Sequence, residues 1–358
     1  SDRQRAIVPI AAFAASGEMH KLGTALNQGL DTGLTVSDVK EVLVQVYAYA
    51  GFPRSLNALG EFMAVLDARR QRGIEDAPGR GPGKAIPQGD ALLAAGASNQ
   101  TRLLGGPAEG PLFDFAPAID EYLQIHLFGD IFERDNLDWH SRELATVAAL
   151  AATPGVESQL RSHVAASLRV GLSAGQLRQL AQLLAEQGAV EASRRAGEAL
   201  EQQLAGRVAR VALELGRQVV RAEILQHPEH VVVVAEQALS ALLSSARQIV
   251  VRLHPDDLHL VQIQLAEAMG ARGVRLVPDA GLTRGGCVVE SDIATVDATV
   301  ESRWERSAAS LGHRSAWAGG RESTESTLSP LPEDQDELDE WMGEAHADAH
   351  APREEDRT

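Results

Sequence analysis

Residues 249–257 have the sequence Ile-Val-Val-Arg-Leu-His-Pro-Asp-Asp, and they mark a change in the character of the chain. The β-branched run at 249–253 predicts a strand. The segment His254-Pro255-Asp256-Asp257 predicts the start of a helix, because proline fits the first helical turn and carboxylates there face the positive end of the helix dipole. A strand followed directly by a helix predicts an α/β unit around this stretch.

The sequence on either side supports an α/β domain at 207–312. Downstream, residues 273–277 and 287–290 are predicted strands next to glycine turns, and residues 296–311 are a predicted helix. Upstream, two amphipathic segments are predicted helices; they span 208–225 and 231–243.

The N-terminal part of the chain has a different pattern, with apolar residues at helical spacing and little β signal. We expect helical regions at 1–72 and 119–203. The segment 73–118 between them is a predicted linker, because residues 73–111 contain 9 glycines and 5 prolines. An amphipathic helix is predicted after Thr35 and another after Ser173, and Gly51-Phe52-Pro53 interrupts the first of them, with a second helix over 54–70.

Two short motifs occur in both helical regions and in the same order. Residues 11–16 (Ala-Ala-Phe-Ala-Ala-Ser) match 148–153 (Ala-Ala-Leu-Ala-Ala-Thr), and Gly33-Leu34-Thr35 matches Gly171-Leu172-Ser173. The offsets are 137 and 138 residues, so a single inserted residue separates the two matches. This predicts a tandem duplication. The expected fold class is multidomain: a tandem all-α helical bundle, a small α/β domain and a tail.

The formal net charge of −17 is concentrated at the C-terminal end. Residues 313–358 contain 13 acidic and 4 basic side chains, which gives this segment −9 of the total. The composition predicts a disordered acidic tail, because it offers too little apolar surface to offset chain entropy. Leu338, Trp341 and Met342 are spaced as one face of a short partner-binding helix, although a solvated acidic end is the favoured interpretation. An acidic chain does not suit nucleic acid.

The chain has 358 residues and one cysteine, and 44% of its residues are apolar. This length and apolar fraction predict two or three globular domains. A single cysteine excludes a disulfide framework and fits a reducing compartment. No uncharged stretch approaches the ~18–20 residues of a membrane-spanning helix, and no secretion leader is evident. We therefore expect a cytoplasmic protein without a membrane-spanning segment.

Two stretches of the helical part carry a resemblance to a known family. The first runs from Gly33-Leu34-Thr35 to Tyr47-Ala48-Tyr49-Ala50-Gly51-Phe52-Pro53; the second runs from Arg142-Glu143-Leu144-Ala145-Thr146 through His163 to Gly171-Leu172-Ser173. Residues 1–203 thereby resemble the carboxymuconolactone decarboxylase family. The resemblance implies an alkylhydroperoxidase-like helical bundle that assembles as trimers or hexamers. It also implies a cofactor-free lyase that acts on a carboxylated lactone.

The thiol chemistry of another branch of that fold is excluded. That branch uses a Cys-x-x-Cys pair a few residues before a histidine, whereas Gln159 and Val156 stand at those positions before His163. Without thiols, peroxidase chemistry has no nucleophile and no resolving partner. The other histidines of this region lack metal-ligand spacing, so neither a metal nor a cofactor is expected.

The resemblance and the side-chain chemistry together give the candidate site residues. Glu143 and His163 suit proton transfer, because a carboxylate can orient an imidazole whose pKa lies near physiological pH. Arginines suit a substrate carboxylate, and tyrosines suit a developing oxyanion. The candidates are catalytic Glu143, His163, Glu41 and Tyr49, and substrate-binding Arg142, Arg161 and Tyr47.

Each candidate also has a purely structural interpretation. Glu143 lies near a predicted helix start, where an acid is favourable, and Glu41 could be a surface charge. His163 could be a buried hydrogen-bonded residue, and the tyrosines could belong to the core. The first repeat has Ala25 where the second has His163, and the second lacks the tyrosine element. A complete pocket must therefore combine both repeats, unless activity has decayed.

The α/β part resembles a second, unrelated family. The residues that carry this resemblance are 213–221, 251–257, 279–290 and 296–304. In order and spacing they are similar to the stator family of flagellar and type III secretion export ATPases. The resemblance implies a non-enzymatic protein that dimerises through 207–312 and binds the export ATPase. Cys287 follows two glycines in a predicted strand, and we expect it to be a buried core residue.

Two functions follow from these resemblances. The first is an export-ATPase-binding stator-like protein in which residues 1–203 form an oligomeric platform. The alternative is a cofactor-free decarboxylase that acts through residues 1–203.

Overall fold

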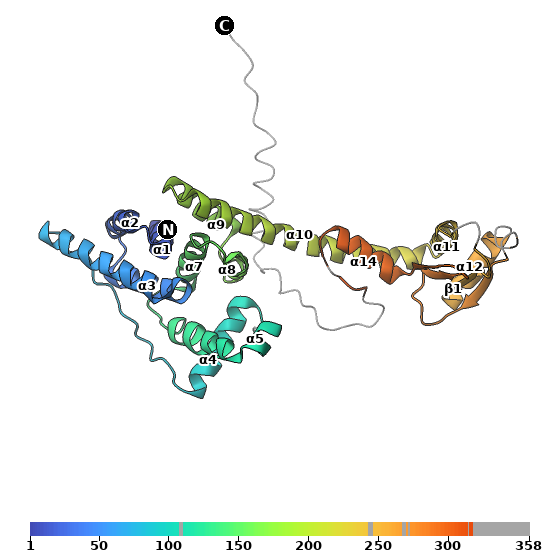
Figure 1. Cartoon of the computed structure of the whole chain (residues 1–358), viewed down its shortest axis with the longest axis horizontal. Helices are drawn as coiled ribbons and strands as arrows, with labels where there is room; N and C mark the ends of the chain where they lie inside the picture. Colours follow the sequence, from blue (N-terminus) through green and yellow to red (C-terminus); the bar gives the residue numbers. More distant parts are fainter. Residues whose placement is uncertain (107–109, 243–245, 267–269, 271–272, 314, 318–358) are drawn as a thin grey trace, which may run out of the picture. The chain divides into compact units, whose positions relative to one another are not determined.

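The computed structural model describes residues 1–358 except 107–109, 243–245, 267–269, 271–272, 314 and 318–358. The chain forms two compact units, Ser1–Ala212 and Leu213–Thr358, which we call the helical unit and the α/β unit (Figure 1). Their boundary falls inside one helix, α10 (Val190–Gln226). A helical part followed by a small sheet-containing part confirms the predicted fold class at this level.

The helical unit places an alanine-rich helix at its centre. Residues 7–15 of α1 are buried all round, and α1 packs against α2, α3 and α7. The two repeated alanine motifs lie in α1 and α7, whose small side chains allow close packing. The described elements of this unit before α10 are α1 (Asp2–Ser16), α2 (Met19–Asp31), α3 (Val36–Gln71), α4 (Asp90–Leu104), α5 (Pro111–Phe115), α6 (Pro117–Tyr122), η1 (Leu123–Ile131), α7 (Trp139–Ala151), α8 (Glu157–Arg169) and α9 (Ala174–Glu186).

The two Gly-Leu-Thr/Ser motifs end one helix and begin the next. Gly33 and Gly171 have φ values of 95° and 103°, which glycine adopts without strain. Thr35 caps α3 and accepts from the backbone of Asp38, and Ser173 caps α9 through Gln176 in the same way. The predicted helix starts after both motifs are confirmed.

Two segments of the helical unit differ from the predicted pattern. Residues 36–71 were expected as two helices around Gly51, and they form one span with a kink at Gly51, where φ is 78°. The segment 73–118 was expected as a linker, but Asp90–Leu104 forms α4 and packs against η1. The Gly and Pro count of the whole segment concealed its alanine- and leucine-rich run, which favours a helix.

The α/β unit contains a four-stranded mixed sheet with the strand order β2-β1-β3-β4. Strand β1 pairs parallel with β2 and antiparallel with β3, and β3 pairs antiparallel with β4. The predicted strand and helix start at 249–257 are confirmed as β1 and α12. The elements after α10 are α11 (His230–Ser240), β1 (Val250–Leu253), α12 (Pro255–Gln264), β2 (Arg275–Pro278), β3 (Cys287–Glu290), β4 (Thr295–Ala298) and α14 (Val300–Ser310).

Strand β4 was missed by the sequence analysis, which expected a helix over 296–311. The structure has a strand to Ala298, then Thr299 as the N-cap of α14, with its side chain accepting from the Ser302 backbone. Cys287 is fully buried in β3, as expected, and burial raises the pKa of its thiol to about 11.

Two apolar clusters hold the α/β unit together. One joins the sheet to α11 and α12. The other lies between α10 and α14, where Leu213, Val300 and Trp304 are buried together with Trp317. Trp317 belongs to the segment 313–358 that was predicted as a tail; the remainder of that prediction, from residue 318, falls outside the described residues.

Candidate functional site

The helical unit contains a group of buried polar side chains between α3, α7 and α8, which we call the buried polar network. Its first part centres on Glu41, which is 1% exposed. The Glu41 carboxylate accepts hydrogen bonds from Arg134 at 2.8–3.0 Å, from Arg142 Nη2 at 2.8 Å and from Asn136 at 3.0 Å. Burial raises the pKa of Glu41, but these hydrogen bonds outweigh burial and hold the pKa below its usual value.

Arg142 carries this network into the centre of the unit. Its side chain is fully buried, and Nη1 donates to Gln45 Oε1 at 2.9 Å while Nη2 also donates to the Arg134 carbonyl at 2.8 Å. Gln45 in turn donates to Thr146 Oγ1 at 3.1 Å. Burial lowers the pKa of Arg142, and the charge of Glu41 opposes this shift. Both Nη atoms of the Arg142 guanidinium therefore donate to other groups of the protein.

The second part of the network is a histidine–carboxylate pair. Nδ1 of His163 on α8 lies 3.0 Å from Oε2 of Glu143 on α7, and both residues are buried. The ring of Tyr49 meets the His163 imidazole edge-on, with 5.1 Å between ring centroids. Burial and the charge of Glu143 raise the pKa of Tyr49 far above its usual value, so its hydroxyl keeps its proton.

Four buried polar atoms of the network have no hydrogen-bond partner among the described residues. They are the Tyr49 hydroxyl, Oε1 of Glu143, Nε of Arg142 and Oδ1 of Asn136. A carboxylate oxygen, an imidazole and a protonated phenol thus lie together in a buried site. Such groups can move a proton and donate to a developing oxyanion.

Five of the seven predicted site residues come together in this network: Glu41, Tyr49, Arg142, Glu143 and His163. Tyr47 has other partners: its hydroxyl forms a hydrogen bond of 3.1 Å with Nε2 of His126, and its ring packs on Phe52. The Arg161 backbone carbonyl accepts from Gln203, and its side chain makes no described contact with the network.

Sequence reasoning missed the residues that connect the network. Gln45 accepts from Arg142 and donates to Thr146. Arg134 and Asn136 both donate to the Glu41 carboxylate. A signal was present, because Glu41, Gln45 and Tyr49 are spaced by four residues, which places them on one face of a helix.

The described residues contain no group of three or more His, Cys, Asp or Glu side chains arranged to hold a metal ion. In the same part of the chain, no helix is both long and apolar enough to cross a membrane.

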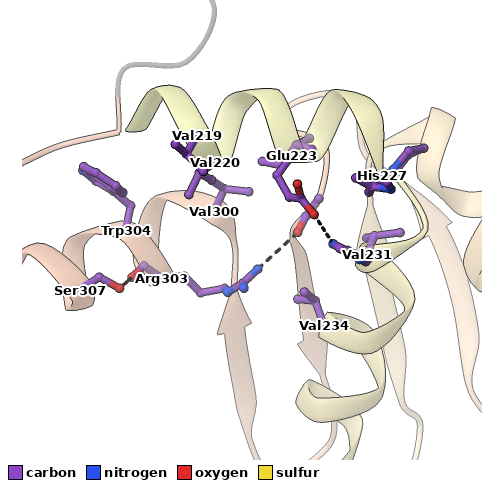
Figure 2. A pocket seen from close by; sticks show the side chains of 14 residues that line it. Val219, Val220, Glu223, His227, Val231, Val234, Val300, Arg303, Trp304 and Ser307 are labelled. Carbon is purple, nitrogen blue, oxygen red and sulfur yellow. Dashed lines mark hydrogen bonds and ion pairs between the residues drawn. The ribbon is translucent and has the colours of Figure 1, made fainter. Parts of the chain in front are cut away.

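The α/β unit contains a pocket of about 330 Å³, which we call the α14 pocket. Figure 2 shows its lining from three helices: Val219, Val220 and Glu223 from α10, Val231 and Val234 from α11, and Val300, Arg303, Trp304 and Ser307 from α14. Most of the lining is apolar, and two of its polar residues, Glu223 and His230, form an ion pair at 3.2 Å. An apolar pocket with a polar rim suits recognition of a partner's apolar side chains.

Comparison with known families finds two different families in this chain, one matched within the helical unit and one matched mainly in the α/β unit. Residues 117–202 match the carboxymuconolactone decarboxylase family, and residues 176–307 match the family described as flagellar assembly protein FliH. The two matches overlap at 176–202, which includes α9 and the first part of α10. Both family resemblances are thereby confirmed, the first of them over residues 117–202.

Individual relatives agree with the second match. The chain is 34% identical to the flagellar assembly protein FliH of Salmonella typhimurium over 110 residues, which is 30% of this chain and 46% of that protein. The FliH protein of Escherichia coli is also 34% identical, over 47% of its length. A type 3 secretion system stator protein of Yersinia pestis is 32% identical over 76 residues, or 20% of this chain and 34% of that protein. The chain thus spans less than half of these relatives.

Proposed function

We propose that this protein is a stator-like component of a flagellar or type III secretion export apparatus, and that it binds the export ATPase through residues 207–312. The observation that carries the proposal is the FliH match at 176–307, which includes every described strand and nearly all of α14. The same unit buries Asp257 in the first helical turn of α12, where its carboxylate accepts from Arg284 and from the Gly285 backbone, so this charge serves the fold.

Self-association is part of the proposal. Leu215 and Leu225 are exposed on α10 and belong neither to the apolar cluster with α14 nor to the lining of the α14 pocket. They support a dimer through 207–312, because exposed apolar stripes on a helix favour pairing. On α3, Phe52, Leu56 and Met63 are also exposed and support the trimer or hexamer expected of 1–203. A tandem, alkylhydroperoxidase-like arrangement of that part is consistent with the contact between α1 and α7.

The test is binding of the full-length chain to the export ATPase of the same cell, measured as complex mass by light scattering. Trp304→Ala and Phe13→Ala each remove a buried aromatic ring, one from each unit, at a cost of about 3–5 kcal/mol. We expect Trp304→Ala to abolish the complex and Phe13→Ala to retain it. No complex with the unmodified chain at micromolar concentration would overturn the proposal.

A lyase function of the helical unit is the second candidate, and the Glu143–His163 pair beside Tyr49 favours it. In this function His163 transfers the proton, Glu143 orients the imidazole, and the protonated Tyr49 hydroxyl donates to the enolate left by loss of CO₂. Arg142 positions Glu41 and Gln45, because its Nη atoms are occupied by protein groups.

The lyase test uses the full-length chain and a carboxylated lactone, with CO₂ release as the measurement. Glu143→Gln and His163→Asn should each lower kcat about 100-fold or more, the usual size of a general acid–base contribution. Arg161→Ala is the matched control and should keep the parent rate. Equal rates in all variants, or no turnover by the parent, would remove this function.

A further inference from the structure

The α14 pocket has an exposed arginine that could pair with a negatively charged occupant. Arg303 is exposed at its edge and donates to the Gly285 carbonyl at 3.5 Å, a weak contact. Glu223, the carboxylate among the residues that line this pocket, forms its ion pair with His230 and not with Arg303. The groove beside it is lined by valines and the Trp304 ring. An occupant that fits this site has apolar anchors next to acidic side chains.

The C-terminal segment of this chain has that composition. Residues 333–342 read Glu-Asp-Gln-Asp-Glu-Leu-Asp-Glu-Trp-Met, with six acidic residues and no basic one. Leu338, Trp341 and Met342 are spaced by three and four residues, the spacing of anchors that an amphipathic helix places in an apolar groove. Tryptophan is also among the residues that contribute most to binding when buried.

The described part of the chain ends next to the pocket. Trp317 is buried and packs on Trp304, with 5.5 Å between ring centroids, and Trp304 lines the pocket. Twenty residues, 318–337, separate Trp317 from Leu338. A chain of that length can span up to about 65 Å, so the segment reaches the pocket with ample slack. Tethering gives it an effective concentration in the millimolar range for short linkers.

We propose that residues 338–342 of the acidic tail occupy the α14 pocket of their own chain, with Trp341 on the valine-lined floor and Asp339 or Glu340 paired with Arg303. The charge pairing and the apolar anchoring act together, because Arg303 stands beside the apolar lining (Figure 2). The tail is then an internal competitor for any partner that inserts apolar side chains into this pocket. This inference does not depend on the proposed binding of the export ATPase.

The test is photo-crosslinking in the full-length chain, with p-benzoylphenylalanine in place of Trp341 and mass spectrometry of the linked peptides. We expect links within one chain from position 341 to peptides that contain Val219, Val231 or Trp304. The same photo-reactive residue in place of Leu331 is the control for tail proximity and should give few such links. Links mainly between chains, links elsewhere, or equal links from both positions would overturn the proposal.

Two matched valines test the pocket itself. Val219 lines the pocket, and Val233 is an exposed residue of α11 outside its lining. Val219→Glu should lower the yield of pocket links about tenfold, the loss expected for one good apolar anchor, whereas Val233→Glu should not. Arg303→Glu, a surface change, should lower the yield as well. If neither Arg303→Glu nor Val219→Glu lowers the yield of pocket links, residues 338–342 do not occupy the α14 pocket.

Discussion

The helical unit and the α/β unit differ in how many polar side chains they bury. Among the described residues, the buried polar and charged side chains belong to the helical unit, apart from Asp257. The helical unit joins Glu41, Arg142, Glu143 and His163 in its interior, whereas the α/β unit has an apolar interior and places charges around the α14 pocket. The contrast separates a unit suited to chemistry inside from one suited to recognition at its surface.

Stability by itself does not explain the buried polar network. Burying an ion pair costs solvation free energy, and replacing such a pair by well-packed apolar groups is often neutral or stabilising. Glu41 and Arg142 sit almost fully buried all the same. Retaining this energetically unfavourable arrangement next to a histidine–carboxylate pair supports a role in positioning that pair.

Replacing Arg142 by methionine should have the largest effect. The change leaves the Glu41 charge buried without its main partner, and we expect the unfolding free energy of the helical unit to fall by about 3–5 kcal/mol. Chemical denaturation with hydrogen exchange resolves the two units. Arg161→Met is the control, with an expected change within about 0.5 kcal/mol. Similar losses in both variants would show that the network has no special energetic role.

Replacing Asp257 by alanine should destabilise the α/β unit by a smaller amount, about 2 kcal/mol, because Gly285 N–H and Arg284 lose their acceptor. The neighbouring Asp256 has a mostly exposed side chain, so Asp256→Ala is the matched control with a loss of about 0.5 kcal/mol. Hydrogen exchange of β1 and α12 measures the difference. Loss of protection in the helical unit instead would contradict the assignment of Asp257 to the α/β fold.

Acidification should weaken the helical unit through Glu41. The folded-state pKa of Glu41 lies below its ordinary value of 4.5, so its charge contributes stability above that value and loses this contribution as the pH falls through the folded-state pKa. The denaturation midpoint of the parent should therefore drop more steeply below pH 4.5 than that of Glu41→Gln. Parallel pH profiles would exclude this role.

Surface changes should alter assembly with the smallest effect on folding. Leu56→Glu in the helical unit and Leu215→Glu in the α/β unit each change an exposed side chain, so the unfolding free energy should shift by only about 0.5 kcal/mol. Light-scattering mass should show dimers for Leu56→Glu, and trimers or hexamers for Leu215→Glu. An unchanged mass in both variants would show that neither stripe mediates self-association.

Local signals made much of the fold predictable. The strand and helix start at 249–257, the caps at Thr35 and Ser173 and the break at Gly51 follow from interactions within a few residues. The errors have local causes as well. Helix α4 was hidden in a Gly- and Pro-rich segment, and β4 runs into the cap of α14 without a turn signal of its own.

The sequence alone determined that two unlike parts follow one another in this chain, because composition, periodicity and capping are properties of neighbouring residues. It also supplied most of the chemistry of the candidate site. Which of those groups meet depends on how the helices pack. Glu41 and Arg142 lie 101 residues apart in sequence and 2.8 Å apart in space, since the packing of α3 against α7 brings them together. The α14 pocket likewise exists only where three helices pack, and no local pattern specifies that geometry.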